Sequence, residues 1–305
     1  MTSFPQALGL AQQQVEEFLS AHFAALAATG VSSPRLVEAM SYAVLNGGKR
    51  LRPLLVFAGA GLFGVPEAAA LRVAAALECV HCYSLVHDDL PAMDDDDLRR
   101  GKPTTHRAFD EATAILAGDG LLSEAFAILA DPATSPAPAH RIALVAALAR
   151  ASGASGMVGG QMLDLAAEGR FAAGSTALSE AEIRHLQGLK TGALIGFACQ
   201  AGCLLAPAST PAEREALASF GAGFGLAFQL KDDLLDVEGD TALVGKALRK
   251  DEAAGKATLV GVLGVAPARA ALARVTAEAG EALGVFGGRA ELLRELLAYN
   301  ATRDA

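Results

Sequence analysis

Helical periodicity recurs along almost the whole chain and is interrupted by short turns rich in glycine and proline. Apolar residues return at helical spacing, and no run of more than a few residues alternates with the period of a strand. The hydrophobic fraction is 52%, whereas aromatic residues make up only 5% and tryptophan is absent, so alanine, leucine and valine dominate. Such a composition favours closely approaching helices. The pattern therefore predicts an all-α fold.

The linkers between the helical stretches are short, and no shift in composition divides the chain. We therefore predict one domain over residues 1–305. The predicted helices are Gln6–Ala28, Pro34–Leu45, Glu67–His87, Ala108–Leu129, Ala139–Ala151, Ser179–Leu205, Pro211–Val237, Pro267–Leu283 and Ala290–Asn300.

One passage resembles a nucleotide-binding loop. The apolar stretch Leu54–Ala58 runs into Gly59–Gly64, which has the G-x-G-x-x-G spacing of a dinucleotide fingerprint. Val65-Pro66 follows the last glycine directly, whereas a true fingerprint continues into an uninterrupted helix. We therefore interpret the segment as a helix that ends in a glycine-rich turn.

Charge and cysteine content narrow the class of protein. The formal charge of −9 and the lack of a basic stripe predict no nucleic-acid partner. We interpret the four cysteines as reduced core thiols of a cytoplasmic protein, because all lie in apolar helical stretches: Cys79, Cys82, Cys199 and Cys203. The N-terminus lacks the features of a signal peptide. Residues 191–212 carry no charge, but Gln200 and Pro207 interrupt them, so we predict a buried helix and no membrane span.

Two acidic clusters carry most of the chemical information. Asp88 ends a strongly apolar helix and opens a run that continues with Asp89 and Asp94–Asp97. Asp232 and Asp236 lie four residues apart in a second apolar helix, and therefore on one face of it. Asp88 and Asp94 are six residues apart, but Pro91 breaks the helix between them and allows them to converge.

Carboxylates grouped in this way suit Mg²⁺, which prefers several hard oxygen ligands and phosphate-bearing substrates. For Asp95–Asp97 alone, a solvated acidic loop is an equally natural interpretation. His81 and His87 next to Asp88 leave zinc as an alternative, although they lack recognised zinc spacing.

Cations accompany both clusters. Lys49, Arg50 and Arg52 follow Gly47-Gly48, where glycine permits close approach of an anion and arginine matches phosphate oxygens. The remaining candidates are Arg99 and Arg100 after the first cluster, Lys190 in a helix, and Lys246 and Lys256 after the second cluster. Metal-binding carboxylates and cations together predict a site for polyanions, and two sets predict two diphosphates.

At these residues the chain resembles the trans-prenyl diphosphate synthases, most closely the bacterial farnesyl diphosphate synthases. The matching segments occur in family order: Gly47–Pro53, Glu78–His106, Gly156–Leu165, Lys190–Ile195 and Phe228–Asp240. The resemblance implies a bundle of long helices around a central cavity, a homodimer, and a cofactor of about three Mg²⁺ ions per active site, with Mn²⁺ as an alternative. It implies head-to-tail condensation of isopentenyl diphosphate with dimethylallyl and geranyl diphosphate.

The resemblance also assigns roles position by position. Metal binding falls to Asp88, Asp94 and Asp232, with Asp89 and Asp236 near the metal or behind its ligands. The allylic diphosphate is assigned to Arg99, Lys190 and Lys246, with Thr191, Gln229 and Lys256 nearby. Isopentenyl diphosphate is assigned to Lys49, Arg52, His81 and Arg100. The residues expected to act in catalysis are Asp88, Asp94, Arg99, Lys190 and Asp232.

Chain length depends on the helix before Asp88. In the family, a bulky aromatic five residues before the first aspartate closes the product pocket, so Tyr83, with Ser84 beside it, predicts a C15 product. The alternatives are a geranylgeranyl diphosphate synthase, a terpene cyclase and a non-catalytic synthase subunit. The chain departs from the family at Lys231, Arg249 and Lys250, and a basic cap at its end, Arg303-Asp304-Ala305, is not clearly present.

Overall fold

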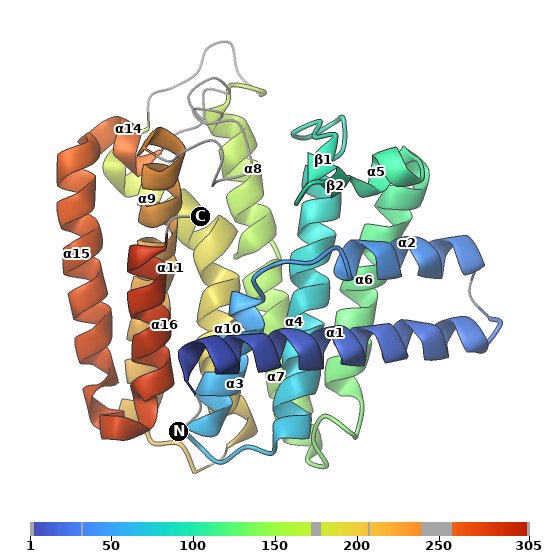
Figure 1. Ribbon diagram of the computed structural model, residues 1–305, viewed down its shortest axis with the longest axis horizontal. Helices are drawn as coiled ribbons and strands as arrows, with labels where there is room; N and C mark the ends of the chain where they lie inside the picture. Colours follow the sequence, from blue (N-terminus) through green and yellow to red (C-terminus); the bar gives the residue numbers. More distant parts are fainter. Residues whose placement is uncertain (1–2, 32, 172–177, 207, 239–257, 304–305) are drawn as a thin grey trace. The chain divides into compact units, whose positions relative to one another are not determined.

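The computed structural model describes residues 3–31, 33–171, 178–206, 208–238 and 258–303. Helices dominate these residues, and the β structure among them is one two-stranded hairpin, as the predicted all-α class requires (Figure 1). They form two compact units, Met1–Val145 and Ala146–Ala305. The single domain over residues 1–305 stays a prediction.

The first unit is built around α4, a helix that is buried along most of its length and packs against α3 and α6. Pro34 occupies the first turn of α2, and the Asp110 side chain caps α6 by accepting the Thr113 N–H at 2.8 Å. The elements are α1 Phe4–Ala28, α2 Pro34–Val44, α3 Leu51–Gly61, α4 Glu67–Asp88, β1 Leu98–Arg99, β2 Lys102–Pro103, α5 Thr105–Ala108, α6 Glu111–Ala130 and the start of α7 Pro138–Ser152. The helix α3 confirms the helical interpretation of the segment that resembles a nucleotide loop.

The second unit is arranged around α11, which packs along α10 and α15. Its elements are the end of α7, then α8 Met157–Ala167, α9 Glu180–Gln187, the π-helix η1 Gly188–Gly192, α10 Ala193–Leu205, α11 Pro211–Glu238, α14 Leu259–Leu263, α15 Val265–Ala282, the 3₁₀-helix η2 Leu283–Ala290 and α16 Glu291–Thr302. The stretch from α9 to α10 is the single helix that the sequence predicted, with a π turn inside it.

Glycine pairs let α10 and η1 lie unusually close to α11. A Cβ added at Gly225 would lie 3.1 Å from the Gly192 Cα, and one added at Gly221 would lie 3.2 Å from the Gly196 Cα. A larger residue at either position would push the helices apart. Close backbone packing at these glycines therefore fixes the register of η1 and α10 on α11.

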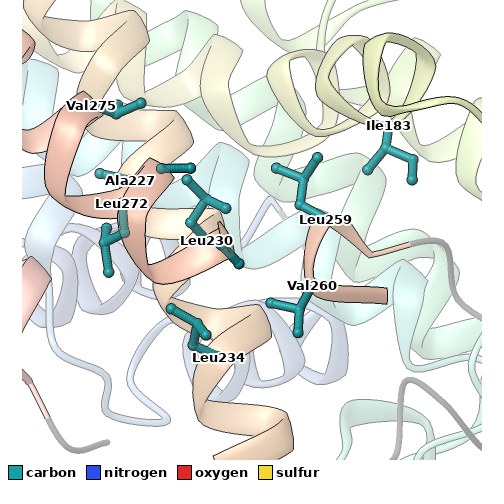
Figure 2. Close-up of a cluster of buried hydrophobic side chains, with 10 residues drawn as sticks. Ile183, Ala227, Leu230, Leu234, Leu259, Val260, Leu272 and Val275 are labelled. Carbon is teal, nitrogen blue, oxygen red and sulfur yellow. The ribbon is translucent and has the colours of Figure 1, made fainter. Parts of the chain in front are cut away.

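A buried apolar cluster joins α9, α11, α14 and α15 (Figure 2). Leu230 and Leu234 of α11 lie in it with Leu259 of α14, Ile183 of α9 and Val275 of α15. Apolar burial of this kind is the main driving force for holding helices together. It fixes the part of α11 that bears the second acidic cluster.

The predicted helices agree with the observed long ones, but α8, the hairpin and the short elements α5, α14 and η2 were not predicted. The pair Gly159-Gly160 hides the helical character of α8, and strands of two residues have no readable periodicity. All four cysteines are buried and free, as predicted. Among the described residues, four helical stretches are long and apolar enough to cross a membrane by length and composition, including Glu180–Leu205, in which 44% of the apolar window is buried.

Candidate active site

The first acidic cluster begins at the last residue of α4 and continues into the loop that leads to β1. The Asp94 N–H donates to the Asp88 carbonyl at 2.8 Å, and the Asp96 N–H donates to the Asp89 carbonyl at 3.2 Å. The loop therefore doubles back over the end of the helix after Pro91. This confirms that the backbones of Asp88 and Asp94 converge.

Asp89 is the buried member of this cluster. Its carboxylate accepts hydrogen bonds from the Arg99 guanidinium, with the Nε at 3.0 Å from Oδ1. Burial raises the pKa of Asp89, while the hydrogen bonds and charge of Arg99 oppose that rise. The same guanidinium lies 3.5 Å from Asp96. Arg99, predicted to bind the allylic diphosphate, is thus also the internal counter-ion of the first cluster.

Asp95 and Asp97 behave as the solvated acidic loop that the sequence left open. Both are exposed, and Arg107 lies between them, 2.5 Å from Asp97 and 3.9 Å from Asp95. Pairs this exposed contribute little to stability.

The β1–β2 hairpin directs Arg100 toward the glycine-rich segment. Its turn is made by Arg100 (φ 55°) and Gly101 (φ 77°), the left-handed pair typical of a type I′ turn. The Arg100 guanidinium donates to the Gly47 carbonyl, and a Cβ added at Gly48 would lie 2.6 Å from its Cζ. Because Gly48 also has φ 125°, only glycine fits there without strain.

Arg52 and His81 are neighbours in the first unit, with Nη1 and Nε2 3.4 Å apart. Burial, and then the charges of Arg52 and Arg100, lower the pKa of His81 well below its usual value, so the ring is neutral at pH 7. A neutral imidazole can accept a hydrogen bond from Arg52. Lys49 is exposed next to Gly48. The four residues assigned to isopentenyl diphosphate therefore lie around one glycine-rich turn and the facing part of α4.

Arg50 has a different role from its two cationic neighbours. It adopts a left-handed conformation (φ 50°) and is buried, with Nη1 at 2.5 Å from Glu78 of α4 and Nη2 at 2.5 Å from the Val44 carbonyl. Removing either partner of such a buried ion pair destabilises the protein, because the remaining charge stays buried without its partner. Arg50 therefore shapes the glycine-rich turn from inside.

Tyr83 is buried on α4, and burial raises its pKa to about 12. Its ring packs edge-on against His87, at 5.7 Å between centroids, and the His87 Nε2 lies 3.0 Å from the Ile115 carbonyl of α6. Ser84 donates to the His81 carbonyl at 2.7 Å. Within the part of the chain that the structure describes, no group of three or more His, Cys, Asp or Glu residues is placed to hold a metal ion.

In the second unit, the π turn η1 presents Lys190 and Thr191. The Lys190 Nζ lies 2.5 Å from an Asp164 carboxylate oxygen on α8, and Asp164 is buried. A Cβ added at Gly160 would lie 2.2 Å from the Lys190 backbone nitrogen, so α8 can approach η1 only through glycine. π-bulges are frequent at functional sites. Sequence reasoning missed Asp164, although it lies inside the recognised segment Gly156–Leu165.

Asp232 is paired with the last described residue of the chain. The Arg303 guanidinium lies 2.5 Å from the Asp232 Oδ1 and 4.7 Å from the centre of the Phe228 ring. Arg303 is buried, whereas the Asp232 side chain is 38% exposed. The sequence left a terminal basic cap unclear, and in the structure Arg303 engages the second acidic cluster directly. Asp236 is buried one turn further along α11.

Gln229 and Asp233 form a second contact on α11, with the Gln229 amide 3.5 Å from the Asp233 carboxylate. Gln229 was predicted to lie near the allylic diphosphate. Lys246, Lys256, Arg249 and Lys250 lie outside the described residues.

A cavity of about 630 Å³ opens in the second unit between α7, α10 and α11. Phe197, Leu204 and Leu226 line it together with Gln187. Among the residues described, its lining contains none of those assigned to a diphosphate, so we do not identify it with the diphosphate site.

Comparisons with known proteins identify the family of the chain. The Polyprenyl synthetase family model matches residues 33–282. The chain is 47% identical over 268 residues to the farnesyl diphosphate synthase of Escherichia coli (strain K12), covering 87% of this chain and 86% of that protein. It is 44% identical over 273 residues to the farnesyl diphosphate synthase of Geobacillus stearothermophilus, covering 89% and 88%.

Solved structures give the same result. The apo crystal structure of an FPP/GFPP synthase from Zymomonas mobilis matches with a TM-score of 0.82 at 44% identity, covering 96% of this chain and 98% of that one. The predicted isoprenoid synthase fold and the prenyltransferase class are confirmed. The chain belongs to the polyprenyl synthetase family.

Proposed function

We propose that this protein is a metal-dependent prenyltransferase that condenses isopentenyl diphosphate with dimethylallyl and then geranyl diphosphate to give (2E,6E)-farnesyl diphosphate. The observation that carries the proposal is the cation set of the first unit, in which Arg52 and His81 lie 3.4 Å apart and Arg100 is held against Gly47. A terpene cyclase ionises a single allylic diphosphate and needs no such second anion site. The two farnesyl diphosphate synthases compared above support the same reaction.

The acidic residues fit a divalent metal by their chemistry. Asp88, Asp94 and Asp232 would hold Mg²⁺, or Mn²⁺, through hard carboxylate oxygens, with Asp89 and Asp236 beside them. Mg²⁺ is commonly bound by one or two carboxylates together with substrate phosphates, so a preformed three-ligand cluster is not required. About three bound ions would stabilise the negative charge that develops on the departing diphosphate, and would so favour ionisation of the allylic C–O bond.

The chain's own residues bind, orient and protect the reactants. Lys190, whose ammonium is held by Asp164, and Arg99 would bind the allylic diphosphate together with Thr191, Lys246 and Lys256. Arg52 and Arg100 would place isopentenyl diphosphate, whose double bond attacks the allylic carbon. A neutral His81 would serve there as a hydrogen-bonding group. The attack leaves a carbocation on the isopentenyl unit, and the proton lost from a neighbouring carbon, which restores a double bond, would pass to the diphosphate that has left.

Chain length would be set by Tyr83. A buried, bulky ring five residues before Asp88 is expected to stop the product tail at C15. With Tyr83→Ala, the main product should become longer than C15.

The proposal extends to assembly and location. We also propose a homodimer, in which the exposed apolar residues Ile115 (44% exposed) and Leu116 (57% exposed) would become buried if α6 forms the interface. We expect a cytoplasmic protein that acts on small diphosphates without a nucleic-acid partner or membrane span.

Product analysis tests the function. Purified protein is incubated with Mg²⁺, labelled isopentenyl diphosphate and either dimethylallyl or geranyl diphosphate, and the products are dephosphorylated and separated. Farnesol as the main product supports the proposal, and geranylgeraniol would keep the reaction but reject the chain length. Absence of metal-dependent elongation would reject the synthase assignment and favour a cyclase or a non-catalytic subunit.

A further inference from the structure

We propose that Asp233 is a positioning residue, a buried carboxylate that keeps Lys190 on η1 in register with Asp232 on α11. The inference rests on the proposed function, and it gives the second aspartate of this cluster a role other than metal binding.

Asp233 is 3% exposed, and its carboxylate is surrounded by donors from three elements. The Leu259 N–H, at the start of α14, donates to Oδ2 at 2.9 Å. The Gln187 side-chain amide, at the end of α9, donates to the same oxygen at 3.3 Å. The Gln229 amide, one turn earlier on α11, lies 3.5 Å from Oδ1.

This environment differs from that of Asp232, the preceding residue. Successive residues on an α-helix point about 100° apart, so the two carboxylates leave α11 in different directions. Asp232 is partly exposed and meets the charged Arg303, whereas Asp233 is buried and accepts the Leu259 N–H. A buried carboxylate is tolerated where several donors satisfy it, and Asp233 accepts from groups of the protein itself.

The Gln187–Asp233 contact connects two functional segments. Gln187 is the residue immediately before η1, three positions ahead of Lys190, and Asp233 immediately follows Asp232. On the other side of Lys190, the close approach of Gly192 to Gly225 fixes η1 on α11. The π turn is therefore attached to α11 at both ends. A displacement of about 1 Å between reacting groups can cost ~100-fold in rate, so this attachment matters for turnover.

The test compares four variants in steady-state assays with geranyl and isopentenyl diphosphate, together with Mg²⁺ titrations and thermal unfolding. Asp233→Leu removes the carboxylate but keeps its volume. Asp233→Asn keeps an oxygen that can accept from Leu259 and Gln187, while the Gln229 amide can flip to accept from the new NH₂ group. Gln187→Leu removes one donor to Asp233, and since the Gln187 Oε1 has no hydrogen-bond partner among the described residues, its loss leaves no donor there unsatisfied. Thr258→Ala is the control, because it removes the hydroxyl that caps α14 by accepting the Gly261 N–H at 3.0 Å, and it leaves Asp233 unchanged.

We expect Asp233→Leu to lower kcat ~100-fold and Gln187→Leu about 10-fold, with the double variant no worse than Asp233→Leu alone. Asp233→Asn should stay within about fivefold of wild type, and Thr258→Ala within about twofold despite a lower Tm. The Mg²⁺ concentration for half-maximal rate and the KM for isopentenyl diphosphate should change by no more than about twofold in all of them.

Two results would overturn the proposal. If Asp233→Asn is as damaging as Asp233→Leu and both require more Mg²⁺, Asp233 is a metal ligand. If Gln187→Leu has normal kcat, the contact is only structural, and this holds even where Asp233→Leu fails to fold. A wild-type protein without elongation activity would instead reject the proposed function.

Discussion

The two acidic clusters are built in opposite ways. In the first, the carboxylates and the cations that hold them come from one continuous segment, because Asp89 pairs with Arg99 and Asp97 pairs with Arg107. In the second, an ordinary helix orders the carboxylates, but their partners come from distant elements: Arg303 meets Asp232, and Gln187 meets Asp233. The first cluster is therefore a local structure, whereas the second depends on the packing of the whole unit.

Substitutions within the loop after α4 should therefore change the geometry of the first cluster. The geometry of the second cluster should instead respond to substitutions far away in the sequence. In the proposed function, Asp88 and Asp232 bind metal, whereas Asp89 pairs with Arg99 inside the protein.

The largest effect is expected when a metal-binding carboxylate is neutralised in either cluster. Asp88→Asn and Asp232→Asn should each lower kcat about 1000-fold, since a bound metal contributes several kcal/mol of stabilisation to the developing charge. Asp97→Asn is the matched control: it lies in the same acidic run but is exposed and paired with Arg107, so its kcat should stay within about twofold. Steady-state rates at saturating Mg²⁺ measure all three. Equal losses in Asp97→Asn and Asp88→Asn would mean that the acidic run acts only through its total charge.

The second prediction concerns stability in the first cluster. Asp89→Ala leaves the partly buried Arg99 without its main partner, and we expect a loss of about 2 kcal/mol, below the value for a fully buried pair because Arg99 is 29% exposed. Asp97→Ala breaks an exposed pair in the same loop and should cost less than about 0.5 kcal/mol. Urea unfolding measures both. A loss in Asp89→Ala no larger than in Asp97→Ala would show that Arg99 finds another partner.

The same contrast explains what could be predicted from the sequence. Periodicity was sufficient for the long helices, and Pro91 was sufficient to predict that Asp88 and Asp94 converge. The hairpin was missed because each strand has two residues, and its turn depends on Arg100 in a left-handed conformation that favours glycine. Local rules therefore describe the first cluster well, apart from this turn.

The second cluster was predicted less completely, because its partners are separated from it along the chain. Asp164 is 26 residues from Lys190, Gln187 is 46 residues from Asp233, and Arg303 is 71 residues from Asp232. Helical spacing places Asp232 and Asp236 on one face but cannot say which distant residue meets them. Only the packing of α8, α9 and α16 supplies that information.

The third prediction concerns His81 in the first unit. Its folded pKa is lowered, so as the pH falls the unfolded chain takes up this proton first. The contribution of His81 to stability is therefore full above its usual pKa of about 6.5 and is lost as the pH falls toward its lowered value. His81→Gln should reduce the slope of unfolding free energy against pH by up to ~1.4 kcal/mol per pH unit between about pH 6.5 and 5. Urea unfolding at several pH values measures the slope, and an unchanged slope would contradict the lowered pKa of His81.

The smallest effect is expected for the long-range partner in the second cluster. Arg303→Met keeps the apolar stem over Phe228 but removes the charge beside Asp232. Because Asp232 is 38% exposed, we expect a loss of about 1 kcal/mol in metal-free protein, together with a coupling of similar size to Asp232→Asn in a double-mutant cycle.

Addition of Mg²⁺ with inorganic pyrophosphate sharpens this test. If Asp232 is a metal ligand, the metal and Arg303 share one carboxylate, and the coupling measured by urea unfolding should shrink when the metal is bound. A coupling that does not change with Mg²⁺ would mean that Asp232 serves Arg303 rather than the metal. Asp232 would then have a structural role, as Asp89 has in the first cluster. The two clusters would differ in how far their partners lie along the chain, and not in function.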